Sequence, residues 1–189
     1  MVRLLDDPIP FLEHENADVR RLAISVCVAS GLSDASIAAV SRRLAVDEDG
    51  AARAMAAEAL GGAGDAAISD LNRARADDDP RVVESVATAY GELRAGAAVP
   101  WLIEVATGDG DRSGREAAVA ALGAIGDEAA VPALLGLVAK APPQVRRRAV
   151  VALTVFDDPA VEPAIRAAAR DRNPSVREAA EMVVGRQPT

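Results

Sequence analysis

The 189-residue sequence is half apolar but only 2% aromatic, and its formal net charge is −8. A core of this composition must consist of Ala, Val, Leu and Ile, which favours closely packed helices. The single cysteine, Cys27, excludes an internal disulfide and is expected to be a buried thiol in a reducing compartment. The first residues contain Asp and two prolines where a secretory signal needs an apolar stretch, and no segment approaches the roughly 18 apolar residues of a membrane span. We therefore expect a cytoplasmic protein without a membrane partner.

A five-residue segment of the form V-R-x-x-A recurs along the chain. Its copies begin at Val19, Ala52, Val83, Gly114, Val145 and Val176. Successive copies start 33, 31, 31, 31 and 31 residues apart. This period indicates an array of similar structural units.

Each unit is predicted to be a helical hairpin. First helices are expected to begin at segments such as AAVPWL, AAVPALL and AVEPAI, because proline fits the first turn of a helix. Polar turns such as VDEDG and ADDDP follow, and their Asp side chains can cap the second helix, which V-R-x-x-A opens and glycine ends. The predicted single domain comprises a capping repeat, four internal repeats and a C-terminal repeat with its tail, over residues 1–31, 32–65, 66–96, 97–127, 128–157 and 158–189.

Apolar or small residues fall four, seven and eight positions after the Val position, in one stripe at helical spacing. A lone hairpin cannot cover this stripe, so neighbouring units must stack. These units resemble HEAT repeats, specifically the short bacterial type also seen in phycobilisome-lyase-like proteins, and the best copy runs from Gly114 to Val138. The resemblance implies an all-α, right-handed α-solenoid of about six hairpins, with the second helices on its concave side. The third repeat is expected to depart from the pattern, with Glu84 at the arginine position and Gly91 at a leucine position.

No catalytic, cofactor or metal site is predicted. The chain also resembles deoxyhypusine hydroxylase, a HEAT-type family that binds iron through several His-Glu pairs, but it contains one histidine, His14, and so lacks the ligands. A Ser or Cys nucleophile would need a histidine base, which is available only at one end of the array. The acidic turns recur in every unit, so helix capping explains them without a calcium or acid–base site.

One arginine per unit follows the Val position, and these five are predicted to form a structural ladder with turn aspartates of their own or the next repeat. The five are Arg20, Arg53, Arg115, Arg146 and Arg177.

Nucleic-acid binding through the arginine-rich C-terminal third is a minor alternative. Residues 128–189 carry nine basic and seven acidic side chains, but residues 1–127 carry 12 and 22, which opposes a phosphate backbone along the whole array. Few aromatic side chains are present to stack on bases.

The remaining positions of the second helices, two, three, six and ten after the Val position, are expected to face outward on the concave side. They form a small, apolar strip that predicts a partner protein or peptide. The candidate partner-binding residues are Arg21, Leu22, Met55, Glu58, Ser85, Val86, Ala89, Glu116, Ala120, Arg147, Arg148, Val151 and Met182.

The last helix still carries apolar side chains at Met182, Val183 and Val184, with no further repeat to cover them. Either the tail GRQPT folds back over them, or this end meets another protein or another copy of the chain. The sequence therefore predicts a non-catalytic interaction scaffold or adaptor. A phycobilin-lyase-like or other substrate-handling protein is the alternative, for which no pocket residues are apparent.

Overall fold

The computed structural model describes residues 3–185, and all regular structure in that range is helical. Its helices divide between two compact units, one ending at Leu93 and the other beginning at Arg94. The prediction of all-α structure is confirmed, whereas the prediction of a single domain stays a prediction.

The first unit contains three hairpins. The first helix of the opening repeat is only a 3₁₀ segment, η1 (Ile9–Glu13), as its prolines suggest, and α1 follows it. The second hairpin is α2 and α3, and the third is the broken helix α4 between two 3₁₀ segments, followed by α5. Their bounds are α1 Ala17–Ala29, α2 Asp34–Val46, α3 Gly50–Gly61, η2 Gly64–Ala67, α4 Ile68–Arg73, η3 Ala74–Ala76 and α5 Pro80–Glu92.

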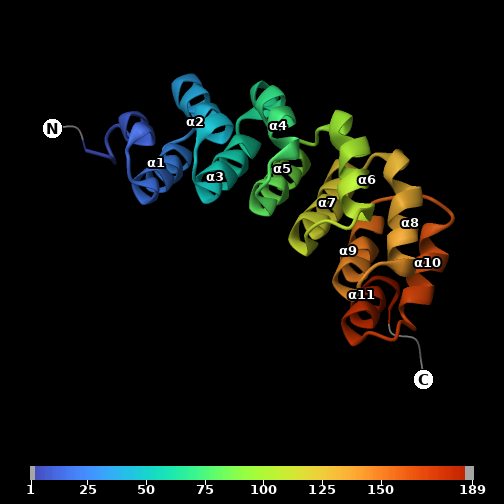
Figure 1. Ribbon diagram of the computed structural model, residues 1–189. Coiled ribbons are helices and arrows are strands. Elements are labelled where there is room, and N and C mark those ends of the chain that lie inside the picture. The colour runs from blue at the N-terminus through green and yellow to red at the C-terminus, as the bar shows by residue number, and fades with distance from the viewer. Residues whose placement is uncertain (1–2, 186–189) are drawn as a thin grey trace. The chain divides into compact units, whose positions relative to one another are not determined.

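The second unit also contains three hairpins, which pair α6 with α7, α8 with α9 and α10 with α11. Their bounds are η4 Gly96–Ala98, α6 Val99–Thr107, α7 Arg112–Ile125, η5 Glu128–Ala130, α8 Val131–Lys140, α9 Pro143–Leu153, α10 Val161–Ala168 and α11 Pro174–Val184. In both units, second helices pack on second helices, so α1, α3 and α5 form one row and α7, α9 and α11 another, and the first helices of each unit lie along one side of its row (Figure 1).

Polar side chains start the second helices. Asp49 accepts a hydrogen bond from the Ala52 amide at 2.7 Å, and Asn16, Asp79, Asp111 and Asn173 cap their helices in the same way. Such a cap stabilises a helix by about 1 kcal/mol. Only α9 starts without one, after Pro142.

These caps correct the register of the third repeat. The Val position lies three residues after the capping position in the other five repeats, and three residues after Asp79 is Val82, not Val83. Val82 is fully buried, in agreement with that frame. The arginine position is therefore Val83 and the leucine position Tyr90, so the assignments of Glu84 and Gly91 to these positions were wrong. Pro80 at the first turn and Asp79 at the cap fix the frame that the V-R-x-x-A pattern missed.

Small residues let neighbouring second helices approach closely. A Cβ added to Gly61 of α3 would lie 3.2 Å from the Ala89 Cα of α5, and one added to Gly123 of α7 would lie 3.0 Å from the Ala152 Cα of α9. These distances are shorter than ordinary van der Waals contacts, so the glycines set the helix spacing. The expected burial of Cys27 is confirmed, and that burial raises the pKa of its thiol.

Tyr90 is the largest fully buried side chain in the described residues. Its hydroxyl donates to Asn72 Oδ1 and accepts from Arg75 Nε, both at 2.7 Å, and the Arg75 guanidinium lies 4.9 Å from the ring centroid. Burial raises the pKa of the phenol although Arg75 opposes the shift, so the hydroxyl remains a neutral donor that ties α5 to α4 and η3.

Candidate binding face of the second helices

Three of the five repeat arginines make bidentate ion pairs with an aspartate in the turn of the next repeat. The Arg20 Nε and Nη2 atoms lie 2.7 and 2.6 Å from the two carboxylate oxygens of Asp47, and the other two pairs have the same geometry. The third guanidinium nitrogen, Nη1, donates to a carbonyl just before its own helix. We call these pairs the arginine ladder: Arg20 with Asp47, Arg53 with Asp77 and Arg146 with Asp171.

The other two repeat arginines bind carbonyl oxygens. Arg115 donates to the Ala106 carbonyl at 3.2 Å, because the next turn has Ala141 and Pro142 in place of aspartate. Arg177 lies in the last repeat and donates to the Asp171 carbonyl at 2.8 Å. Neither is within ion-pair distance of a carboxylate in residues 3–185.

The ladder aspartates are held ionised. Burial, the largest single influence on Asp47 and Asp77, raises their pKa values, but hydrogen bonds from arginine and from the Asp49 and Asp79 amides outweigh it and leave both below the ordinary value. For Asp171, the hydrogen bond from its arginine is the largest influence and lowers the pKa. These carboxylates are already hydrogen-bonded and paired, so they are poorly suited to exchanging protons with a substrate near neutral pH.

His14 and Asp79 also have local hydrogen-bond partners. His14 Nδ1 accepts from the Asn16 amide at 3.1 Å, and the His14 carbonyl accepts from Arg20. Asp79, hydrogen-bonded by the Arg81 side chain and amide, has its pKa lowered to about 2. Within the described range no His, Cys, Asp and Glu side chains cluster in groups of three or more that could hold a metal ion.

The structure sorts the predicted partner-binding residues into three groups. The exposed ones are Leu22, Glu58, Ala120, Arg147, Arg148, Val151 and Met182. The half-buried ones are Arg21, Met55, Ser85 and Glu116. The expectation that Val86 and Ala89 face outward was wrong, because both are fully buried.

The burial of Val86 and Ala89 follows from the corrected register of the third repeat. Counted from Val82, the outward positions of α5 are Glu84, Ser85, Thr88 and Glu92. This part of the face is therefore polar and acidic, where the sequence pattern predicted an apolar strip. Reading the register from the cap at Asp79 would have found these residues.

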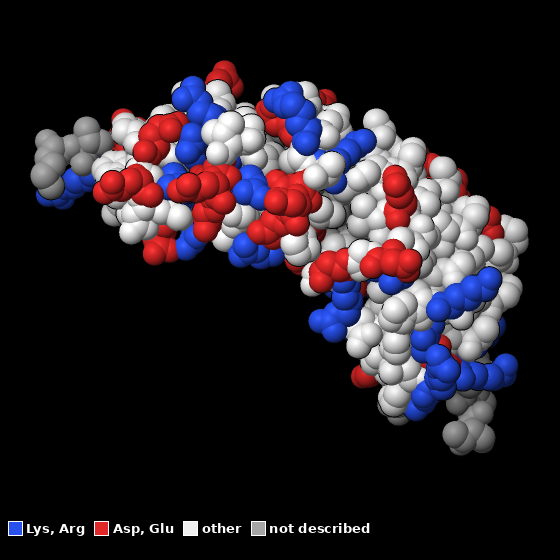
Figure 2. All heavy atoms as spheres, in the orientation of Figure 1, with Lys and Arg blue, Asp and Glu red and all other residues white. Residues whose placement is uncertain are grey.

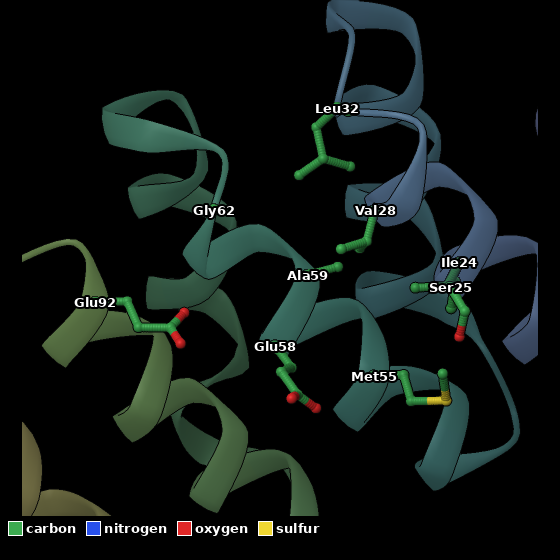
Figure 3. A pocket seen from close by; sticks show the side chains of 10 residues that line it. Ile24, Ser25, Val28, Leu32, Met55, Glu58, Ala59, Gly62 and Glu92 are labelled. Atoms are coloured by element: carbon green, nitrogen blue, oxygen red, sulfur yellow. The ribbon is translucent and has the colours of Figure 1, made fainter.

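Three of the predicted face positions, Ser25, Met55 and Glu58, line a groove of about 620 Å³ in the first unit (Figure 3). Its apolar wall comes from α1 and the turn after it, where Val28 and Leu32 point toward α3. The Val28 side chain is 49% exposed. The full lining is Ile24, Ser25, Val28, Gly31, Leu32, Met55, Glu58, Ala59, Gly62 and Glu92.

A second groove, of about 410 Å³, lies between α9 and α11 in the second unit. It includes the predicted residues Arg147, Val151 and Met182, and the Met182 side chain is 82% exposed. The prediction that the tail GRQPT folds back over this end concerns residues 186–189, which lie outside the described residues. Self-association through the C-terminal repeat stays a prediction.

The net charge lies in the first unit. Residues 1–93 carry nine basic and 17 acidic side chains, a net of −8, whereas residues 94–189 carry 12 of each. Figure 2 shows Asp and Glu side chains in a band over the part of the molecule that holds α1 to α5, and several Lys and Arg side chains near the C-terminal end. The two units therefore differ in net charge.

Some arginines of the C-terminal third make ion pairs or hydrogen bonds within the protein and are not free to bind nucleic acid. Arg146 is in the arginine ladder, Arg166 pairs with Glu162, and Arg177 binds carbonyl oxygens. The exposed remainder is Arg147, Arg148, Arg170 and Arg172.

The stacked hairpins, the capped second helices and the arginine ladder define a helical-repeat protein. HEAT-repeat family models match residues 5–90, 71–153 and 136–188. The chain belongs to the HEAT-repeat family, and its fold is an α-solenoid. No curated protein matches the chain.

Solved structures with this fold include phycocyanin lyase, YibA and deoxyhypusine hydroxylase. A chain from the complex of CpcE and CpcF of phycocyanin lyase from Nostoc sp. PCC7120 matches at 22% identity and a TM-score of 0.74. The match covers 95% of this chain and 75% of that chain. Escherichia coli YibA matches at 20% identity and 0.65, with 95% and 69% coverage, and human deoxyhypusine hydroxylase at 19% and 0.50, with 95% and 94%. At these identities the likeness shows the fold alone. In residues 3–185, no helix is both long and apolar enough to cross a membrane.

Proposed function

We propose that this HEAT-repeat chain is a non-catalytic scaffold or adaptor that binds a partner protein or peptide on the face formed by its second helices. The observation that carries the proposal is the exposure of large apolar side chains on these helices. Leu22 and Val28 of α1, Val151 of α9 and Met182 of α11 are 53%, 49%, 49% and 82% exposed. Apolar surface of this kind, rimmed by charge, is typical of interaction surfaces.

The non-catalytic part of the proposal is supported by how the polar residues are used. The turn aspartates cap helices or pair with arginine, and the buried phenol of Tyr90 has two hydrogen-bond partners. A substrate-handling role like that of the phycocyanin lyase remains the alternative, and its supporting observation is the shared fold. The grooves of α1–α3 and α9–α11 would be the places for a small molecule in that case.

Site-specific photo-crosslinking tests the proposal. p-Benzoylphenylalanine replaces Leu22 in α1 or Val151 in α9, and the matched control positions are Ala38 in α2 and Ala139 in α8, which are exposed on first helices. Irradiation in native lysate is expected to give a cross-linked protein from Leu22 or Val151 and none from the controls.

Equal cross-linking from both sets of positions, or none from any, would overturn the proposed face. Intact-mass analysis separates the two candidate functions, because an adduct of small-molecule mass in place of a protein would favour the lyase-like alternative.

A further inference from the structure

We propose that the groove between α1 and α3 binds a basic amphipathic helix, with its apolar side against α1 and a Lys or Arg beside Glu58 and Glu92. This inference names the partner chemistry of the proposed function and rests on it. The groove, its two carboxylates and the charge of the first unit carry it together.

The spacing of the lining residues matches a helical partner. Along α3 the groove is lined by Met55, Glu58, Ala59 and Gly62, at i, i+3, i+4 and i+7. At about 1.5 Å per residue this row is about 11 Å long, which is two turns of helix. A partner helix would place its own i, i+3 or i+4, and i+7 side chains along such a row.

The backbone N–H and C=O groups of a partner bound in this groove must be hydrogen-bonded. An extended peptide usually gains affinity by adding a strand to an exposed sheet edge. The described part of the chain contains no strand to offer such an edge. A helix, whose backbone groups bond within the segment, avoids leaving amides unpaired against the apolar wall of Val28 and Leu32.

The carboxylates give the groove its charge preference. Glu58 and Glu92 are the only titratable side chains that line it, and no described arginine, lysine or histidine is within ion-pair distance of either. The Glu92 carboxylate lies against Gly61 of α3, 2.1 Å from where a Cβ on that glycine would be, so it points toward α3 and the groove (Figure 3).

The arginines of α1 and α3 are already paired with carboxylates. Arg21 pairs with Asp49 at 2.7 Å and with Asp18, and Arg20 and Arg53 belong to the arginine ladder. The first unit thus has a net charge of −8 and two unpaired glutamates at an apolar groove. A cationic helix would supply the missing charges, while an acidic helix would be repelled.

Fluorescence anisotropy with designed peptides tests this inference on the full chain. The probe is a labelled 18-residue peptide of Leu and Lys with Leu at i, i+3, i+4 and i+7, and the comparison peptides are its scrambled sequence and the same pattern with Glu for Lys. The Leu/Lys helix is expected to bind at least tenfold more tightly than either comparison peptide.

Groove variants locate the binding. Glu58→Gln and Glu92→Gln are each expected to weaken it by about two- to fivefold, the scale of a partly exposed ion pair. Glu48→Gln is the matched control, because Glu48 is an exposed glutamate of the same unit that lies outside the groove. Met55→Lys and Met55→Glu remove the same apolar contact but introduce opposite charges. The Lys variant should therefore bind the Leu/Lys peptide much more weakly than the Glu variant, because its charge repels the peptide. Circular dichroism verifies that each variant is folded.

Three results would overturn the inference: no binding of the Leu/Lys helix, equal losses for Glu48→Gln and the groove variants, or equal binding of the Leu/Glu helix. The proposed function is judged separately. Photo-crosslinking from Leu22 without binding of the Leu/Lys helix would leave the scaffold proposal standing and remove only the basic partner.

Discussion

Removing one partner of a buried ion pair should destabilise the first unit strongly. The Asp47 side chain is fully buried and the Arg20 side chain is 6% exposed. Asp47→Ala leaves that guanidinium without its bidentate partner and also removes the acceptor of the Asp49 amide, at 3.0 Å. An uncompensated buried charge of this kind costs about 3–5 kcal/mol. For a chain of this length that cost lowers the melting temperature by about 6–20 °C, at about 2–4 °C per kcal/mol.

The matched control is Asp78→Ala. Asp78 also pairs with a ladder arginine, Arg53, at 3.0 Å, but its side chain is 95% exposed. The expected loss is therefore only about 0–1 kcal/mol. Thermal unfolding of both variants is followed by circular dichroism at 222 nm, with urea titration as a second measurement.

The double variant Arg20→Met with Asp47→Leu should be more stable than Asp47→Ala, because no unpaired charge then remains at the Arg20 position. A loss for Asp47→Ala no greater than that for Asp78→Ala would refute the reasoning. It would mean that water reaches the guanidinium once the carboxylate is gone.

Three further outcomes are expected. Acidification should destabilise the fold, because the ladder aspartates have lowered pKa values: their contribution is complete above the unfolded pKa of about 3.9 and is lost as pH falls through the folded values. Urea unfolding from pH 7 to 3 measures this, and stability that rises on acidification would contradict it. Gly123→Ala should cost about 1–3 kcal/mol because its Cβ would meet Ala152, whereas Gly136→Ala in the open part of α8 should be neutral or stabilising. Equal thermal shifts would disprove close packing at Gly123. If the C-terminal repeat self-associates, Met182→Glu should convert the oligomer to a monomer by light scattering, and a wild-type monomer at high concentration would remove that prediction.

The repeat itself could be predicted because its signals are local. Proline at first turns, Asp or Asn at caps and apolar spacing on second helices act within about ten residues, so the sequence predicts hairpins and their order. The same local reasoning failed at Val83. The V-R-x-x-A pattern is degenerate in the third repeat, and the cap at Asp79 decides its register.

The sequence could not predict which group each repeat arginine binds, because that depends on how the hairpins stack. For an arginine such as Arg53, the sequence contained aspartates both in the same repeat and in the next repeat. Stacking of the hairpins places this arginine beside the aspartate of the next repeat, Asp77. Arg115 shows the converse, because Ala141 and Pro142 occupy the corresponding turn and only a carbonyl is available.

The sequence alone determined the HEAT-type repeat and the apolar stripe of each helix, since both follow from periodicity along the chain. Only the tertiary structure decided which outward side chains share a groove. Val28, Glu58 and Glu92 are far apart in sequence and meet because α1, α3 and α5 pack side by side. Periodicity assigns a residue to one side of its own helix, but the spacing and stagger of neighbouring helices, set by contacts such as Gly61 on Ala89, decide what that side faces.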